Sequence, residues 1–257
     1  MQQCGKLELV FARRDGQTYL KHAFHRTPLQ IVRPFALATG GVSVTIINPT
    51  AGIMGGDEFE IDVVLESHTH VELTTQSASK IHKMHPDQHA VQHVRFEVAD
   101  FASLGYYPQT IIPFAESDYQ QSLKVRLSTQ AQFAMLETWA SGRIARGERL
   151  AFRRYANSSS IWLGQDLEYL ERFCLQPQAT NLSAFGLLEQ QTHTLSGFFT
   201  GQFNPDTPLP DFIQHGQTQQ QHTWLRGISQ SSLLLDQAAA TVRVAMRQHM
   251  ATKTSID

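Results

Sequence analysis

The sequence predicts a mainly β protein whose many short strands form a sandwich, a barrel or a β-helical stack. Three observations predict this class. Apolar and polar residues alternate over short runs, turn-forming residues separate these runs, and a helix-like pattern occurs only in the last third of the chain. No long amphipathic helix interrupts the runs before residue 180, which disfavours a parallel α/β fold.

Alternation is clearest in two runs, Val42-Val44-Ile46 and residues 59–65 (FEIDVVL), each of which places its apolar side chains on one face of a strand. Further strand-like runs are residues 7–11, 71–75, 94–98, 123–127 and 133–136. Breaks are expected at Arg14-Asp15-Gly16 and at Ser141-Gly142.

The last third has a different pattern. Residues 204–210 are rich in turn formers, 214–222 are a Gln/His tract, and 236–250 read as a helix. A length of 257 residues fits one large β-rich domain, so we expect residues 1–257 to form one unit. Its β-rich body covers about 6–180, and a mixed tail with a helix covers about 181–257.

Composition excludes several classes of function. Charged residues make up 17% of the chain and the formal net charge is -2, so the chain lacks the excess of positive charge that binds nucleic acid or an anionic membrane. No stretch approaches about 18 uninterrupted apolar residues, and the N-terminus lacks the pattern of an export signal. The two cysteines, Cys4 and Cys174, form no CxxC motif, and we expect a cytoplasmic protein.

The sharpest local motif is residues 52–57 (GIMGGD), between two predicted strands. It lacks the Lys-Ser/Thr of a P-loop, and a strand follows it, so no helix N-terminus meets a phosphate. We interpret Gly52, Gly55, Gly56 and Asp57 as a structural turn that reverses the chain. The glycines supply positive φ, and the aspartate caps free backbone amides.

Two polar segments follow. Residues 74–80 (TTQSASK) end in Ser79 and Lys80, but they lack the Ser-x-x-Lys spacing and the strained elbow of a covalent catalyst. A histidine concentration comes next, formed by His82, His85, His89 and His93. Because Pro86 breaks any helix that would align them, two interpretations stay open: a solvated loop, or a weak exposed metal site built from His82, His85 and His89. No HExxH motif supports a zinc hydrolase.

The run 133–139 (FAMLETW) places the carboxylate of Glu137 among apolar residues, where burying it would cost free energy without a partner or a cation. After it, charges alternate with small residues in 141–148 (SGRIARGE). Here Gly142, Arg143, Gly147 and Glu148 read as a structural corner in which arginine and glutamate form bidentate pairs.

The ordered series of motifs resembles the urease accessory protein family UreD, also called UreH. The matching segments, in order, are residues 33–35 (RPF), 48–57 (NPTAGIMGGD), 74–80, 107–109 (YPQ), 112–115 (IPFA), 142–143 (GR) and 147–148 (GE). The resemblance covers roughly residues 6–177 and implies strands in stacked β-helical, sandwich-like layers with one or two C-terminal helices.

The resemblance also implies a role. Such a protein binds UreF, which recruits the GTPase UreG, and the assembly supplies nickel to apo-urease. The chain would be a scaffold and conduit for transient nickel(II) and not an enzyme, with no tightly bound cofactor and with room for a dimer within the complex. By position, the nickel passage of the family corresponds to Ser79, Glu137 and Glu171.

Two other functions compete with this one. The first is a metal-dependent hydrolase or isomerase that uses the His82–His93 loop with Glu137 or Asp57. The second is an interaction module that needs no internal passage.

Overall fold

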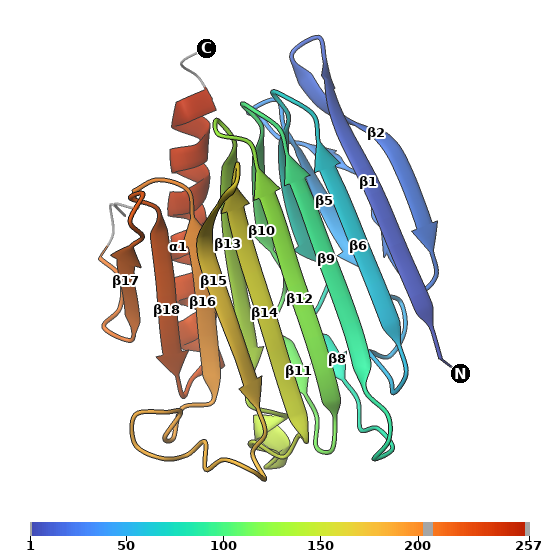
Figure 1. The fold of residues 1–257 in the computed structure, drawn as a ribbon, viewed down its shortest axis with the longest axis vertical. Helices are drawn as coiled ribbons and strands as arrows, with labels where there is room; N and C mark the ends of the chain where they lie inside the picture. Colours follow the sequence, from blue (N-terminus) through green and yellow to red (C-terminus); the bar gives the residue numbers. More distant parts are fainter. Residues whose placement is uncertain (1, 203–207, 255–257) are drawn as a thin grey trace.

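The computed structural model describes residues 2–202 and 208–254, and it shows two facing β-sheets with one long helix against the outer face of one of them (Figure 1). The predicted mainly β class with a C-terminal helix is confirmed. The turn-rich segment predicted at 204–210 falls largely outside the described residues; Pro208 to Pro210 are irregular.

Sheet A has seven strands in the order β15-β14-β12-β9-β6-β1-β2. Their bounds are β1 (Cys4–Arg14), β2 (Gln17–Arg26), β6 (Glu58–Leu65), β9 (Ala90–Val98), β12 (Asp118–Leu127), β14 (Arg154–Leu163) and β15 (Asp166–Leu175). The hairpin β1–β2 turns at Asp15 and Gly16, with φ of 50° and 76°, as the predicted break requires.

Sheet B has the order β17-β18-β16-β13-β10-β7-β5-β3, and β4, β8 and β11 pair beside this path. Its bounds are β3 (Gln30–Ile31), β4 (Phe35–Ala36), β5 (Val42–Ile47), β7 (His70–Thr75), β8 (Ser79–Ile81), β10 (Ser103–Tyr107), β11 (Ile111–Pro113), β13 (Gln132–Ala140), β16 (His193–Phe199), β17 (Ile213–Gln217) and β18 (Thr223–Ser229).

Between β5 and β14 the chain winds as a β-helix. It alternates between the sheets, so β6, β9, β12 and β14 stack in parallel in sheet A while β5, β7, β10 and β13 stack in parallel in sheet B. Antiparallel strands flank this winding: the β1–β2 hairpin at one side, and β15 to β18 at the other. The stacked layers inferred from the resemblance are therefore present.

The main core lies between the two sheets. Every second residue of β6 is buried there, including Ile61 and Val63, and Phe96 of β9 and Phe133 of β13 join the same cluster. This two-residue period is the one that predicted the strands.

A second core lies between the outer face of sheet B and helix α1 (Ser232–Thr254). The helix buries Ala238, Val242 and Met246 among Leu195 and Leu225 of the sheet. It is longer than the predicted 236–250. The tail before the helix contains β16 to β18, and the Gln/His tract overlaps the edge strand β17.

Candidate functional site

The glycine turn carries the chain from β5 in sheet B to β6 in sheet A, so it crosses between the two sheets. Gly52 and Gly56 have φ of 146° and 86°, values that favour glycine. At Gly55 the constraint is space, since a Cβ would lie 2.5 Å from Oε1 of Gln88. The buried Asp57 accepts the backbone N–H of Met54 at 2.8 Å, as the capping interpretation expects.

The corner at 142–148 is held by a bidentate ion pair from Arg143 to Glu148, in which Nε donates to Oε2 at 2.8 Å. The Arg143 guanidinium also lies 4.1 Å above the ring of Phe114. The hydrogen bond from Arg143 is the main cause that lowers the pKa of the Glu148 carboxyl. Arg146, the second arginine of the motif, is exposed.

Gly142 and Gly147 both have positive φ, at 138° and 74°, but their surroundings differ. A Cβ on Gly142 would lie 1.9 Å from the carbonyl oxygen of Glu148, whereas a Cβ on Gly147 would meet nothing within 4 Å. Gly147 is the left-handed C-cap of the short 3-10 helix η1 (Ile144–Arg146).

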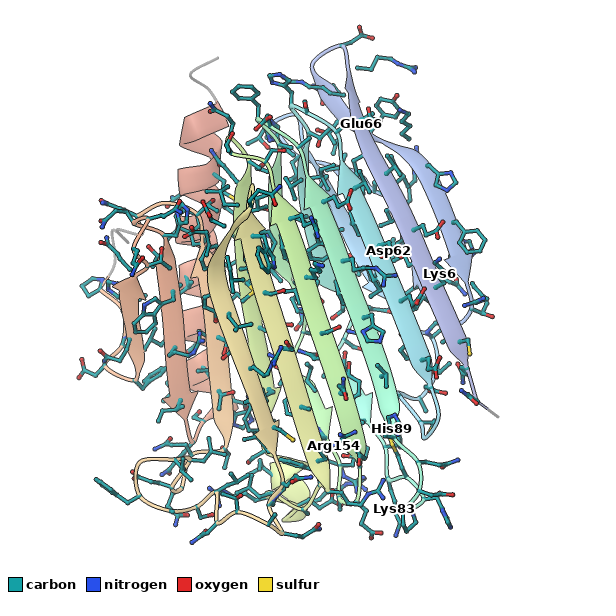
Figure 2. All side chains as sticks on the ribbon, in the orientation of Figure 1. Lys6, Asp62, Glu66, Lys83, His89 and Arg154 are labelled. Atoms are coloured by element: carbon teal, nitrogen blue, oxygen red, sulfur yellow. The ribbon has the colours of Figure 1, made fainter. Side chains whose placement is uncertain are left out.

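The three histidines of the possible weak metal site differ in their contacts. Nε2 of His82 lies 3.0 Å from the carbonyl oxygen of Ala51, and Nδ1 of His85 lies 2.5 Å from Oδ1 of Asp87. His89 is exposed, at the lower end of the molecule in Figure 2. Within residues 2–202 and 208–254, no group of three His, Cys, Asp or Glu residues could hold a metal ion.

A cavity of about 100 Å³ between the sheets brings Ser79 and Glu137 together in one lining. Its lining includes loop residues 48, 50–53 and 76–78, and strand residues that include Tyr106, Tyr119 and Gln121. Burial raises the pKa of both tyrosines, so their hydroxyl groups stay protonated. A volume of this size can hold several water molecules.

Glu137 lies on β13 and is 9% exposed. Its Oε1 accepts a long hydrogen bond of 3.4 Å from Gln121, and its Oε2 has no partner in the described structure. Burial is the main cause that raises the pKa of Glu137 from 4.5 to about 7, and the nearby charge of Glu171 adds to it. The predicted cost of burying this carboxylate is thus present.

Glu171 lies on β15 and faces sheet B, but it is not part of the cavity lining. Its Oε1 accepts a hydrogen bond from Ser196 at 3.0 Å and lies 3.0 Å from NH2 of Arg226. Arg226 also donates to the hydroxyl of Tyr169 at 2.6 Å. Because Glu137, Ser196 and Arg226 share one register row across β13, β16 and β18, a polar row connects the two glutamates.

Sheet A contributes a facing polar row that sequence reasoning missed. Gln121 of β12 is in register with Gln92 of β9 and Asn157 of β14, and its Nε2 donates to Oδ1 of Asn157 at 3.0 Å. The alternation of inward and outward residues along β12 is the sequence pattern that could have identified Gln121. Gln121 occupies an inward position between the buried Tyr119 and Leu123.

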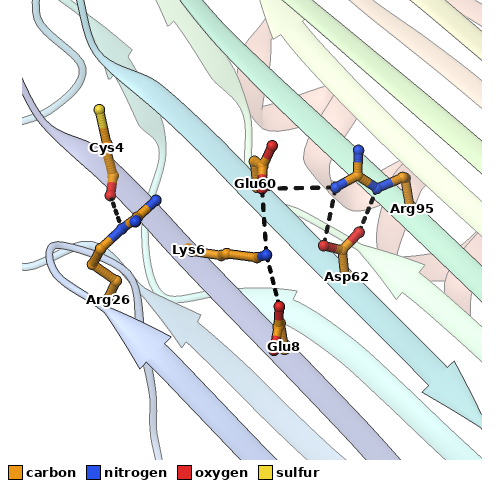
Figure 3. A network of polar contacts seen from close by, with 7 residues as sticks. All are labelled: Cys4, Lys6, Glu8, Arg26, Glu60, Asp62 and Arg95. Carbon is orange, nitrogen blue, oxygen red and sulfur yellow. Dashed lines mark hydrogen bonds and ion pairs between the residues drawn. The ribbon is translucent and has the colours of Figure 1, made fainter.

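The outer face of sheet A carries ion pairs of a different kind (Figure 3). Lys6 bridges Glu8 and Glu60, and Arg95 binds Asp62 through two hydrogen bonds. These side chains are between about a quarter and a half exposed. Exposed pairs are worth about 0 to 1 kcal/mol, so this network supports strand pairing and offers no enclosed site.

The fold and the site together define a mainly β, solenoid-like protein with a polar cavity between its sheets. The chain belongs to the UreD urease accessory protein family, whose model matches residues 3–254. It is 36% identical over 254 residues to the urease accessory protein UreD of Deinococcus radiodurans. The aligned region covers 96% of this chain and 91% of that protein.

Other relatives carry the same family name. The urease accessory protein UreD of Acetivibrio thermocellus is 36% identical over 194 residues, covering 75% of this chain and 74% of that protein. The urease accessory protein UreD 1 of a Synechococcus strain is 33% identical over 225 residues, covering 87% and 84%. None of the helices in the described part of the chain is long and apolar enough to cross a membrane.

Proposed function

We propose that this chain is a urease accessory scaffold and nickel conduit, which acts with UreF and the GTPase UreG to deliver nickel to apo-urease. It holds nickel(II) only in transit and catalyses no reaction. The observation that carries the proposal is Glu137, a buried carboxylate with an unpartnered oxygen in the cavity that it shares with Ser79. Family membership supplies the urease context.

The chemistry of the lining suits passage better than storage. Hydroxyl, amide and carboxylate groups are part of the cavity lining, including those of Ser79, Gln121 and Glu137. Imidazole nitrogen suits nickel(II), whereas hydroxyl, amide and single carboxylate oxygens suit harder cations, so these groups hold nickel(II) weakly and release it. A hydrated divalent ion also compensates the negative charge that the interior disfavours at Glu137.

The polar row gives the passage a direction. From Ser79 near the loops the cavity reaches Glu137, and Ser196 then links Glu137 by register to the carboxylate of Glu171. Neighbouring strands lie about 4.8 Å apart, which sets the spacing of the side chains along this row. In the proposal, Ser79, Glu137 and Glu171 line successive stretches of one path.

Reconstituted activation tests the proposal. Apo-urease is activated with UreF, UreG, nickel and either this chain, Glu137→Gln or Glu137→Leu, and nickel content and urease activity are measured. Glu137→Gln keeps the shape and should slow nickel loading mildly. Glu137→Leu should reduce loading more, because an apolar side chain dehydrates the path.

The matched control is Glu97→Leu, since Glu97 is exposed on β9 and lies outside the cavity lining. A pull-down of UreF with each variant separates transport from assembly. Normal nickel loading by Glu137→Leu would rule out the path. Loss of UreF binding would show that Glu137 supports the fold or the complex instead.

A further inference from the structure

We propose that a second pocket, at the opposite end of the two-sheet body, binds a small oxyanion of the hydrogenphosphate class. The pocket has a volume of about 470 Å³. It forms where the chain crosses from sheet A to sheet B, near residues 66–69, 99–102 and 128–131. Glu66, at the upper end of the molecule in Figure 2, marks where the first crossing begins. Anion binding in this pocket is independent of nickel transport.

The lining of this pocket favours negative charge. It contains Arg13 and three histidines, His68, His70 and His222, and none of the described residues that line it is acidic. NH1 of Arg13 donates to the carbonyl oxygen of His68 at 3.3 Å, which uses one of the five N–H donors of a guanidinium. The planar guanidinium matches the geometry of an oxyanion.

His70 supplies a second group for an anion. Its Nδ1 lies 2.9 Å from Oγ of Ser103, and its buried Nε2 has no hydrogen-bond partner in the described structure. Burial lowers the pKa of His70, and the charges of Arg13 and His68 lower it further, so the ring is neutral at pH 7. An anion selects the tautomer in which Ser103 donates to Nδ1 and Nε2 carries the proton.

Gln132 indicates which oxyanion fits. Its Oε1 is buried in the pocket lining without a partner among the described residues. An amide oxygen accepts a hydrogen bond, so the ligand should carry a donor besides its negative charge. Hydrogenphosphate offers one O–H group and several acceptor oxygens, whereas sulfate at neutral pH offers acceptors only.

Other contacts fix the wall of the pocket. The ring of His68 is stacked on Phe101, with 4.9 Å between centroids and 11° between planes. Asp100, a carboxylate in one of these crossings, accepts the backbone N–H of Gln130 at 3.0 Å. Nδ1 of His222 accepts the N–H of Gly201 at 3.0 Å. A pocket with preformed walls loses less conformational entropy when a ligand binds.

The test is calorimetric titration of the full chain with sodium phosphate at pH 7, at constant ionic strength, with sodium sulfate as the comparison. Phosphate should bind about 3- to 10-fold more tightly than sulfate, the effect of one added hydrogen bond. Arg13→Gln should weaken phosphate binding about 10- to 100-fold, because it removes charge-assisted hydrogen bonds.

The matched control is Arg14→Gln, which changes the same charge one residue away. The guanidinium of Arg14 lies over the ring of Tyr19, and Arg14 is not in the pocket lining. It should bind phosphate as the unchanged chain does, and so should Glu137→Leu. Arg13→Lys, which keeps the charge and loses the planar guanidinium, is a second variant for the case that Arg13→Gln does not fold. Arg13→Lys should also bind phosphate more weakly than the unchanged chain does. Absence of phosphate binding, equal losses for Arg13→Gln and Arg14→Gln, or tighter binding of sulfate would each overturn the proposal.

Discussion

Glu171 and Arg226 join the two sheets through an ion pair, with 3.0 Å between Oε1 and NH2. The Glu171 side chain is 12% exposed, and that of Arg226 is 38% exposed. The pair lies beside Ser196, which donates to the same carboxylate oxygen. Glu171 is therefore a link between sheets as well as a proposed lining residue of the nickel path.

This dual position predicts the outcome of a double-mutant cycle. Glu171→Leu removes the acceptor of Arg226 and Ser196, and we expect the free energy of unfolding to fall by about 1 to 2 kcal/mol. Adding Arg226→Leu removes the unpaired charge and should recover most of this loss. Urea denaturation of the single and double variants measures it. If Glu171→Leu and the double variant lost the same free energy of unfolding, the lost ion pair would not be the cause of the instability.

Glu137 should make stability depend on pH. Its pKa in the folded chain is raised from 4.5 to about 7, so the folded state binds this proton more tightly than the unfolded state does. Stability contributed by the protonated form is present below pH 4.5 and is lost as the pH rises towards 7, by up to about 3 kcal/mol. Glu137→Gln should remove this loss. The free energy of unfolding of Glu137→Gln, taken relative to that of the unchanged chain, should be higher at pH 8 than at pH 5.

Urea denaturation at the two pH values checks this, with Glu97→Gln as the control because Glu97 is exposed. The control should follow the pH profile of the unchanged chain. Parallel profiles for Glu137→Gln and the unchanged chain would mean that Glu137 titrates normally in the folded protein.

The corner glycines provide a matched pair of substitutions. Gly147→Ala strains a positive φ in open space, and we expect a loss of about 1 kcal/mol in the free energy of unfolding. Gly142→Ala adds a Cβ 1.9 Å from the carbonyl oxygen of Glu148, which forces the backbone of the corner to move. Its loss should be several kcal/mol. Thermal unfolding compares the two, and similar losses would contradict a steric role for Gly142.

Much of the fold could be predicted because alternation is a local signal. The runs at 59–65 and 94–98 lie within β6 and β9, with the predicted side chains buried. The three-residue strands β8 and β11 are too short to show a period. The parallel stacking of β6 on β9 depends on contacts about 30 residues apart, which no local pattern contains.

The site could be predicted only in part. Glu137 was identified because a carboxylate among apolar residues conflicts with its surroundings, and its burial confirms that conflict. Gln121 and Arg226 were not identified, since a single polar residue in a strand becomes informative only when the facing sheet is known. The register row from Glu137 to Arg226 arises from strands nearly 90 residues apart in the chain.

The histidine loop yields the last prediction. His85 and His89 are exposed, so His85→Ala with His89→Ala should change the free energy of unfolding by less than about 0.5 kcal/mol. His82 contacts Ala51 and the ring of Phe114, so adding His82→Ala should cost about 1 kcal/mol. Because the structure gathers no three-histidine site, the triple variant should still bind UreF and activate urease at saturating nickel. Activation assays over a range of nickel concentrations measure this, with the double variant as control. Loss of activation at saturating nickel, with UreF binding intact, would show that the loop is essential for delivery.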